Sequence, residues 1–502
     1  MRIALEIPAG LYGDDTSFAS AGRWADASNV RFWRGQAQVI GGWERLTDTP
    51  LTGVCRSVLA WSDKASLLNI GFGSHSKLQV WRGGGLYDVT PAGLVAGLVD
   101  GTGGQGYGTG AYSTGNFSEP SSGDYFPRTW SLAAWGENLL ACPRGGTIYG
   151  WTNGAGTPAV ALTGAPAVVT HMLVSSTDQV FALGCNEEVS GVFNPLCLRH
   201  SGIRNNTQWT TGAATTAREY VLPGGGRIVA GRVLGSSLLV WTTHGLYLGS
   251  YVGALNQPWR FDRVGEKCGL IGPNAAVVVA QSAYWLGPDL QFYRYELGGA
   301  VEPVICPIRQ GLADNLAPSQ GDKVCASSIS AFGEVRIDYP DSRDGVENSR
   351  YLAVSLIDGA WSRGLMARTA IVDAGPSQYP IGVDPTGAAF YHERGASADG
   401  GAFNWYLESA DQVLDPEQTA LTRGVWPDLA GQVGPISLSV TSRFKPQGAE
   451  KVYGPYAMAP GEDRVDFRAS GRLFRVRFSG GSAPTACRFG KPVFDVAAAG
   501  GR

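Results

Sequence analysis

The sequence predicts an all-β chain: a β-propeller of six or seven blades, followed by a separate β-sandwich-like module. With 71 Gly and 28 Pro among 502 residues, about a fifth of the chain favours turns, against roughly 12% in average proteins. Apolar stretches are four to eight residues long, alternating or β-branched, and bounded by turn residues. The length exceeds the roughly 250 to 300 residues that a single core organises, so several modules or a repeat are expected.

The repeat is a short strand of small and β-branched residues, a polar or glycine turn, and a second apolar strand. An aromatic-bearing third strand follows most of these hairpins, and a fourth strand follows often. Units begin near Arg56, Trp130, His171, Arg227, Pro273, Lys323 and Thr369, at intervals of 74, 41, 56, 46, 50 and 46 residues. All but the first interval match the roughly 40 to 50 residues of a four-stranded blade. A string of β-sandwiches is the alternative.

The oversized first interval contains a Gly/Ser/Tyr-rich stretch at residues 101–128, which has too few apolar side chains to bury a core of its own. We interpret it as a long inserted loop. It serves either as a gate that narrows a channel or as a surface loop. The residues proposed for such a gate are Gly101, Gly103, Gly104, Tyr107 and Tyr112.

Three regions follow from this pattern. Residues 1–50 form an N-terminal extension of platform strands, residues 51–400 the propeller with its insertion, and residues 401–502 a C-terminal β module. Strand spacing changes from about Gly401 onward. In the last long strand, Phe474, Val476 and Phe478 alternate with arginines and are expected to share one buried face.

Charge and cysteine content exclude several classes. A formal charge of −3 with 17% charged residues disfavours a protein that grips phosphate backbones tightly. The eight cysteines are scattered without a C-x-x-C pair, so buried free thiols are expected. The N-terminus has no apolar stretch of signal-peptide length, and no run approaches the roughly 20 residues of a membrane span.

Motifs for cofactors and metals are weak. Residues 101–106 match G-x-G-x-x-G, but no helix follows to aim amides at a pyrophosphate. The P-loop, zinc-protease and nucleophile-elbow motifs do not occur in the sequence. The five histidines lack metal-ligand spacing, and Cys197 with His200 is an isolated pair. We therefore expect no cofactor, no metal and no catalytic residue.

Paired carboxylates leave an enzymatic alternative open, because some propellers are glycosidases with two opposed carboxyl groups. Each pair lies in a turn-like context, which favours solvated loop charge. The pairs are Asp14 with Asp15, Glu187 with Glu188, and Asp341 with Asp344. The segment around Asp399 approximates the Asp-box of sialidase propellers, but a simple Asp-Gly turn fits better.

Several stretches resemble the tail nozzle, or tail tubular B-type and tail hub, proteins of short-tailed bacteriophages. Near the N-terminus, an Asn-Val-Arg-Phe strand is followed by a Gly-Gly-Trp strand. The similar stretches are Ile7-Pro-Ala-Gly-Leu11, Ala27-Ser-Asn-Val-Arg31-Phe32, Gly41-Gly42-Trp43, Thr243-His-Gly-Leu-Tyr247, Pro258-Trp-Arg-Phe261, Cys268-Gly-Leu-Ile-Gly-Pro273, Tyr284-Trp-Leu-Gly287, Gly471-Arg-Leu-Phe-Arg-Val-Arg477, Arg488-Phe-Gly490 and Phe494-Asp-Val496.

This resemblance implies a structural virion protein that is made in the host cytoplasm and resides in the virion tail. It would form a ring, most plausibly of six subunits, around a channel that retains the packaged genome and lets it leave. Its partners would be other copies of itself, tail adaptor or portal-proximal proteins, tail fibre or needle proteins, and genomic double-stranded DNA in transient contact. The near-neutral charge fits a conduit, because tightly held phosphates would oppose transit.

Two other functions remain as alternatives. A propeller glycosidase or lectin that acts on host-surface glycans predicts a carboxylate pair or an aromatic platform in a pocket. An autonomous adhesin is a third, weaker candidate. Closed rings at a portal vertex would distinguish the nozzle from both.

Overall fold

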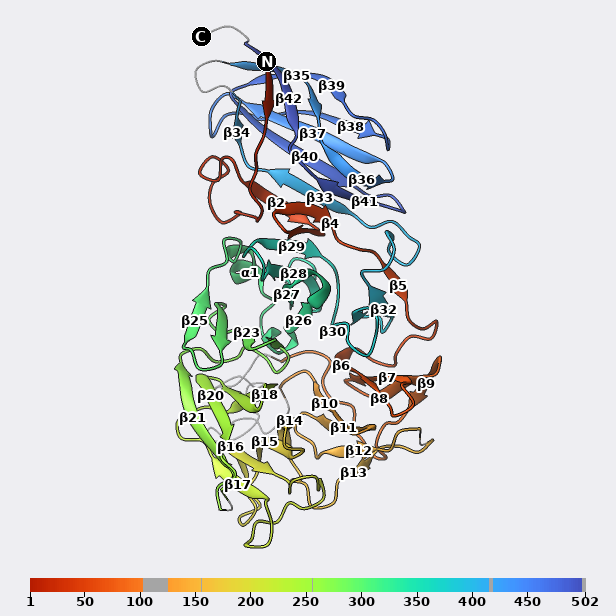
Figure 1. Cartoon of the computed structure of the whole chain (residues 1–502), viewed down its shortest axis with the longest axis vertical. Coiled ribbons are helices and arrows are strands. Elements are labelled where there is room, and N and C mark those ends of the chain that lie inside the picture. Colours follow the sequence, from red (N-terminus) through yellow and green to blue (C-terminus); the bar gives the residue numbers. More distant parts are fainter. Residues whose placement is uncertain (103–124, 155, 255, 415–418, 499–502) are drawn as a thin grey trace, which may run out of the picture.

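The computed structural model describes residues 1–102, 125–154, 156–254, 256–414 and 419–498 (Figure 1). Strands dominate these residues. Helical structure in the same residues is limited to α1 (Gln310–Asn315) and two single 3₁₀ turns, Gly321–Lys323 and Ser330–Phe332. None of the described helices has the length and apolar character that crossing a membrane requires.

Seven four-stranded antiparallel sheets follow one another through the described part of residues 43–392. In chain order they are β6 (Cys55–Ser62), β7 (Leu68–Ser74), β8 (Leu78–Arg82) and β9 (Gly85–Asp88); β10 (Trp130–Trp135), β11 (Asn138–Pro143), β12 (Tyr149–Trp151) and β13 (Val160–Ala161); β14 (Val169–Val174), β15 (Val180–Asn186), β16 (Phe193–His200) and β17 (Arg218–Val221); β18 (Ile228–Leu234), β19 (Ser237–Thr242), β20 (Gly245–Tyr251) and β21 (Trp259–Glu266); β22 (Ala276–Val279), β23 (Ser282–Leu286), β24 (Phe292–Glu296) and β25 (Val301–Val304); β26 (Cys325–Ile329), β27 (Glu334–Pro340), β28 (Asn348–Ser355) and β29 (Trp361–Leu365); and β30 (Ala370–Val372), β31 (Ile381–Val383), β32 (Ala389–His392) and β5 (Trp43–Arg45).

The first strands of these sheets contact one another in a closed ring. β6 contacts β10, and the series continues through β14, β18, β22, β26 and β30 back to β6. In Figure 1 the sheets are arranged around this ring. The fold is therefore a β-propeller, as the sequence predicts. The predicted unit starts lie within three residues of the first strand of each sheet.

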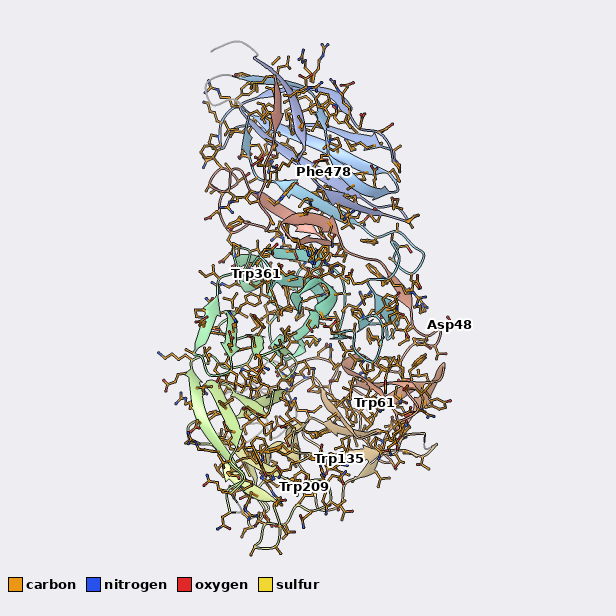
Figure 2. All side chains as sticks on the ribbon, in the orientation of Figure 1. Asp48, Trp61, Trp135, Trp209, Trp361 and Phe478 are labelled. Atoms are coloured by element: carbon orange, nitrogen blue, oxygen red, sulfur yellow. The ribbon has the colours of Figure 1, made fainter. Side chains whose placement is uncertain are left out.

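Side-chain size explains the radial arrangement. Separate hydrophobic clusters fill the spaces between neighbouring sheets, each made of residues from two adjacent sheets. Aromatic rings bridge some of these spaces, as where Trp241 meets Trp285 edge to face at 5.5 Å. Figure 2 labels Trp61 on the first sheet and Trp361 on the sixth, both of which are buried. Large aromatic rings such as Trp241 and Trp285 therefore lie between neighbouring sheets.

The last sheet is closed by a strand from the N-terminal region. β5 pairs with β32, with Trp43 opposite His392. The chain reaches this position through Gly41 and Gly42, where a Cβ atom on Gly42 would lie 2.5 Å from the backbone nitrogen of Ser397. Glycine is required here because the two backbones nearly touch.

The remaining strands form a terminal module built from both ends of the chain. Its sheets are β1 (Arg2–Ala4), β42 (Val493–Ala498), β35 (Ala420–Trp426) and β39 (Val465–Gly471); β2 (Trp24–Ser28), β33 (Trp405–Ser409), β40 (Leu473–Gly480), β37 (Ile436–Arg443) and β38 (Lys451–Met458), with β34 (Gln412–Val413) beside β40; and β3 (Val30–Trp33), β4 (Gln36–Val39), β41 (Ala486–Phe489) and β36 (Leu429–Val433).

The predicted alternation in β40 is confirmed. Phe474, Val476 and Phe478 are buried, whereas Arg475 and Arg477 lie on the other face in ion pairs. Phe478 packs on Phe489 of the neighbouring sheet, which joins the two layers. The strands β1–β4, which the sequence analysis assigned to a separate N-terminal extension, contribute to all three sheets of this module.

A buried arginine connects the module to the propeller. Arg31 on β3 donates two hydrogen bonds to Glu393, at 2.6 and 2.7 Å, and a third to Glu334 on β27 at 3.0 Å. Burial disfavours its charge, but the two carboxylates outweigh that cost and raise the pKa of Arg31 above its ordinary value. Figure 1 shows the module beside the sheet β26–β29, at the rim of the propeller.

Candidate functional site

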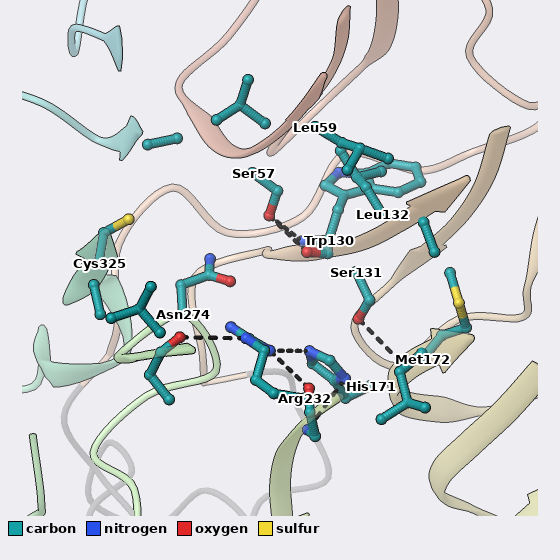
Figure 3. Close-up of a pocket in the computed structure, with 18 of the residues that line it drawn as sticks. Ser57, Leu59, Trp130, Ser131, Leu132, His171, Met172, Arg232, Asn274 and Cys325 are labelled. Carbon is teal, nitrogen blue, oxygen red and sulfur yellow. Dashed lines mark hydrogen bonds between the residues drawn. The ribbon is translucent and has the colours of Figure 1, made fainter. Parts of the chain in front are cut away.

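A cavity of about 590 Å³ lies at the centre of the propeller. All seven innermost strands, β6, β10, β14, β18, β22, β26 and β30, contribute to its wall (Figure 3). Its volume falls in the range of small-molecule sites, roughly 300 to 1,000 Å³. Because the innermost strands run in the same direction around the ring, equivalent positions along each strand lie at the same depth.

Among the residues that line the cavity, polar side chains precede aliphatic ones along β6, β10, β14 and β18. Arg56 and Ser57 precede Val58 and Leu59 on β6, and Ser131 precedes Leu132 on β10. The same order holds at His171 on β14, at Arg232 on β18 and at Asn274 just before β22, each followed by aliphatic residues. One end of the cavity is therefore polar and cationic, and the other end is aliphatic.

Arg232 is the central cation of the polar end. Its guanidinium donates hydrogen bonds to the carbonyl oxygens of Gly231, Pro273 and Ala276, at 2.8 to 3.2 Å. It also lies 3.0 Å from Nε2 of His171. A dashed line marks this contact in Figure 3. Burial lowers the pKa of Arg232 to about 10. These partners are neutral, so the positive charge is solvated without being neutralised.

His171 is held neutral beside Arg232. Burial, together with the charges of Arg232 and Arg144, keeps the pKa of His171 well below its ordinary value. The Gly231 N–H lies 3.4 Å from Nδ1, so N–H groups approach both ring nitrogens. A neutral imidazole accepts only one hydrogen bond. The shorter contact assigns this bond to Arg232.

The two ends of the predicted insertion, which we call its legs, lie beside the polar end of the cavity. They are residues 101–102 and 125–126. Gln320 binds both backbone groups of Gly101, accepting from its N–H at 3.0 Å and donating to its carbonyl at 2.9 Å. Thr102 N–H donates to Tyr125 O at 3.1 Å, which joins the two legs. Phe126 lies between two guanidinium groups, those of Arg144 and Arg227, about 4 Å from each.

Of the proposed gate residues, only Gly101 is in the described part of the chain. Gly103, Gly104, Tyr107 and Tyr112 lie outside the described residues, so the gate hypothesis stays a prediction. A Cβ atom on Gly101 would overlap the carbonyl oxygen of Ser319, which explains the glycine at this leg.

A network of ion pairs surrounds this end of the cavity. Glu347 binds Arg56 at 2.6 Å and Lys323 at 3.0 Å, and Lys323 also binds Asp100 at 2.6 Å. Lys323 is fully buried. The network fixes the start of β6, the turn before β26 and the first leg of the insertion in one arrangement.

The paired carboxylates do not meet in the cavity. Asp341 is buried against Arg343 and Arg350, and Asp344 shares Arg350 at 2.7 Å. Hydrogen bonding to Arg350 holds the pKa of Asp344 below its ordinary value. Glu187 accepts from Ser190 and Asn194, Glu188 accepts from the backbone of Thr211, and Asp14 accepts from the Gln310 N–H. Asp15 is exposed.

Residues considered for metal or Asp-box roles have structural partners. His200 contacts Gln179 and the carbonyl of Ser201, and Cys197 lies 3.9 Å from Cys185 as a free thiol. Across the described residues, no group of three His, Cys, Asp or Glu side chains is arranged to hold a metal ion. The Asp-Gly turn is confirmed, because Asp399 and Gly400 have positive φ between the paired Ala398 and Gly401.

Sequence reasoning did not single out Arg232, Asn274 or Gln320. The sequence does contain a signal for Arg232. Arg232 stands within Ile228–Leu234, where its neighbours are aliphatic or glycine, and a charged residue in such a strand has to be compensated in the fold. Asn274 and Gln320 lie in turns, where polar residues are expected and give no such signal.

The topology thus defines a β-propeller protein whose terminal module is built from both chain ends. No protein-family model matches the chain, and no curated protein matches it. Solved structures similar to it include the Myceliophteria thermophila Cps50 (Swd1) β-propeller domain, at 13% identity and a TM-score of 0.39, covering 69% of this chain and 99% of that one.

Two further solved structures are similar. The computationally designed Ika8 protein has 11% identity and a TM-score of 0.38, with 70% of this chain and all of that chain covered. A chain of the Mitotic Checkpoint Complex has 9% identity and a TM-score of 0.39, covering 70% and 93%. At these values the likeness concerns the fold alone, and the fold assignment rests on the sheet topology.

Proposed function

We propose that the protein is a ring-forming structural component of a bacteriophage tail, the nozzle that retains the packaged genome and releases it. The observation that carries the proposal is the location of the N-terminal motif similar to nozzle proteins. Its residues gather at the joint between propeller and terminal module.

The motif residues make hydrogen bonds across this joint. Asn29, whose φ of 56° is left-handed, donates to the carbonyl oxygens of Leu365 and Asn404, one in each unit. Arg31 binds Glu334 and Glu393, and the Gly41 N–H donates to Glu393 at 3.0 Å. A motif whose Asn29 and Arg31 bind groups of both units favours an architectural role.

A ring imposes a further requirement on the surfaces of the chain. Closed rings need a head-to-tail interface between different surfaces of neighbouring copies. The module is attached at one part of the propeller rim, and the rim around β14–β21 lies far from it (Figure 1). Two unlike surfaces are thus available for a neighbour. We propose six copies per ring.

The proposed partners are an adaptor or portal-proximal protein, a tail fibre or needle protein, and genomic double-stranded DNA in the lumen of the ring. A net charge near zero supports the passage of DNA through the ring, since the protein would hold few of the DNA phosphates. The propeller cavity is too small for duplex DNA, so the lumen would lie between subunits.

The rival glycosidase requires two carboxyl groups that face a pocket, about 5 to 10 Å apart. Asp341 and Asp344 are instead bound to arginines, which gives the rival no specific support. Hydrolysis of host-surface polysaccharide that is lost in the double variant Asp341→Asn, Asp344→Asn would nevertheless establish it. Asp358→Asn, at an exposed loop carboxylate, is the matched control.

Native mass spectrometry and negative-stain electron microscopy of the full chain test the proposal. The expected result is a closed ring of identical subunits with an open centre. A strictly monomeric protein with polysaccharide hydrolase activity would exclude it.

A further inference from the structure

The propeller cavity has the features of a ligand site that is independent of any channel between subunits. Among the described residues, its lining includes Arg56, His171 and Arg232 and no Asp or Glu. The nearby carboxylates of Asp100, Asp322 and Glu347 are already engaged by Lys323, Arg144 and Arg56. The electrostatic character of the cavity therefore favours an anion over a cation.

Donors for such an anion remain at the polar end. The Nη2 group of Arg232 carries two hydrogens and donates one of them to Pro273 O. The Ser131 hydroxyl oxygen accepts from the Met172 N–H at 3.1 Å, and among the described residues its own hydrogen has no acceptor. Figure 3 shows Arg232, Asn274 and Ser131 around the same region of the cavity.

The opposite end would not hold a polar ligand. Leu59, Leu132, Val174, Val233 and Val278 line it, each from a different innermost strand. A small inorganic anion would fill only the polar end and leave this aliphatic surface in water. A ligand that covers both ends carries one anionic group on a short apolar body, and a cavity of about 590 Å³ has room for it.

We infer that the central cavity of the propeller binds a small amphipathic monoanion, with its head group at Arg232 and its apolar body among the aliphatic residues that follow along the strands. Within the described part of the lining, Arg232 is the cation whose partners are all neutral, and a bound anion would neutralise it. Occupation would also stabilise the ring of inner strands, since Arg232 links β14, β18 and the start of β22.

The test uses octanoate as probe and 1-octanol as its uncharged counterpart, with the full chain. Binding is measured by isothermal titration calorimetry and by saturation-transfer NMR of the probe. We expect octanoate to bind at one site per chain. The affinity for 1-octanol should be at least about tenfold lower, because 1-octanol has no charged group to bond with Arg232.

Two variants alter opposite ends of the cavity. Arg232→Gln keeps hydrogen-bonding capacity but removes the charge, and Leu132→Trp fills the aliphatic end. Each is expected to weaken octanoate binding about tenfold or more. Arg260→Gln, at an exposed arginine of β21, is the matched control and should bind like the unaltered chain.

Circular dichroism and thermal melting establish that each variant is folded. If Arg232→Gln does not fold, Leu132→Trp and the comparison of octanoate with 1-octanol still decide the question. The inference is overturned if octanoate shows no binding at millimolar concentration, if 1-octanol binds equally well, or if the folded variants bind octanoate unchanged.

Discussion

Arg31 on β3 of the terminal module binds two carboxylates, one of them on β27 of the propeller. Replacement by Ala would leave Glu334 and Glu393 without their shared cation, with Glu334 fully buried. Removing one partner from a buried ion pair costs about 3–5 kcal/mol. We predict that Arg31→Ala lowers the urea concentration at the midpoint of unfolding. Tryptophan fluorescence monitors the unfolding. Arg472→Ala, at an exposed arginine of the module, is the control, and equal midpoints for the two variants would contradict this account.

The cysteines give a second prediction at the residue scale. All eight are free and buried, as the sequence predicts. Burial raises the pKa of Cys55, Cys306 and Cys325 to about 12, so the reactive thiolate is scarce near neutral pH. The native chain should react negligibly with Ellman's reagent, and the denatured chain should release eight equivalents. Rapid modification of any thiol in the native chain would refute the buried assignment.

Histidine burial predicts the pH dependence of stability. Burial, with the charges of Arg368 and Arg336, holds the pKa of His392 well below its ordinary value. The unfolded chain therefore takes up the proton first, and the stability present above the unfolded pKa of about 6.5 is lost as the pH falls through it. The melting temperature should fall between about pH 7 and pH 5, and fall less in His392→Gln. An identical pH profile for this variant and for exposed His244→Gln would contradict the assignment.

At the level of elements, β5 closes the propeller only because Gly42 lets two backbones approach. Gly42→Ala would place a Cβ atom 2.5 Å from Ser397 N and displace the strand. We predict a loss of about 1–3 kcal/mol, with faster amide exchange in β32. Gly375→Ala, in the loop of the same sheet with open space around it, is the control. Unchanged exchange in β32 would show that β5 does not depend on this approach.

Local patterns were sufficient to predict the strands but not all of their partners. The hairpins, the aromatic third strands and the buried face of β40 follow from alternation and turn residues within short windows. The pairing of β5 with β32 joins residues about 350 positions apart, and β1–β4 complete sheets whose other strands lie near the C-terminus. Such pairings depend on long-range packing, which a single sequence does not encode locally.

The dependence on long-range packing also explains why the residues of the candidate site could not be predicted from local patterns. The cavity lies where the innermost strands of the seven sheets meet. Its chemistry depends on Arg232, His171 and Asn274, which come from different sheets and meet only when the ring closes. The glycine-rich insertion was recognisable from composition, whereas the two hydrogen bonds between Gln320 and Gly101 were not.

For the whole molecule, the joint at Arg31 holds the propeller and the terminal module together, as the proposed ring-forming subunit requires. A ring needs a rigid joint, because small changes in the angle between units would prevent closure. Assembly should therefore be impaired in Arg31→Ala while most strand structure is retained. Normal rings from this variant would show that the joint does not set the geometry of assembly.

Cryo-electron microscopy of the tail of the proposed bacteriophage tests the central claim most directly. The account predicts a closed ring of copies on the tail axis below the portal vertex, with the propeller and terminal module fitting the density of each subunit. A chain that is absent from the tail, or present there only as solitary peripheral copies, would contradict it.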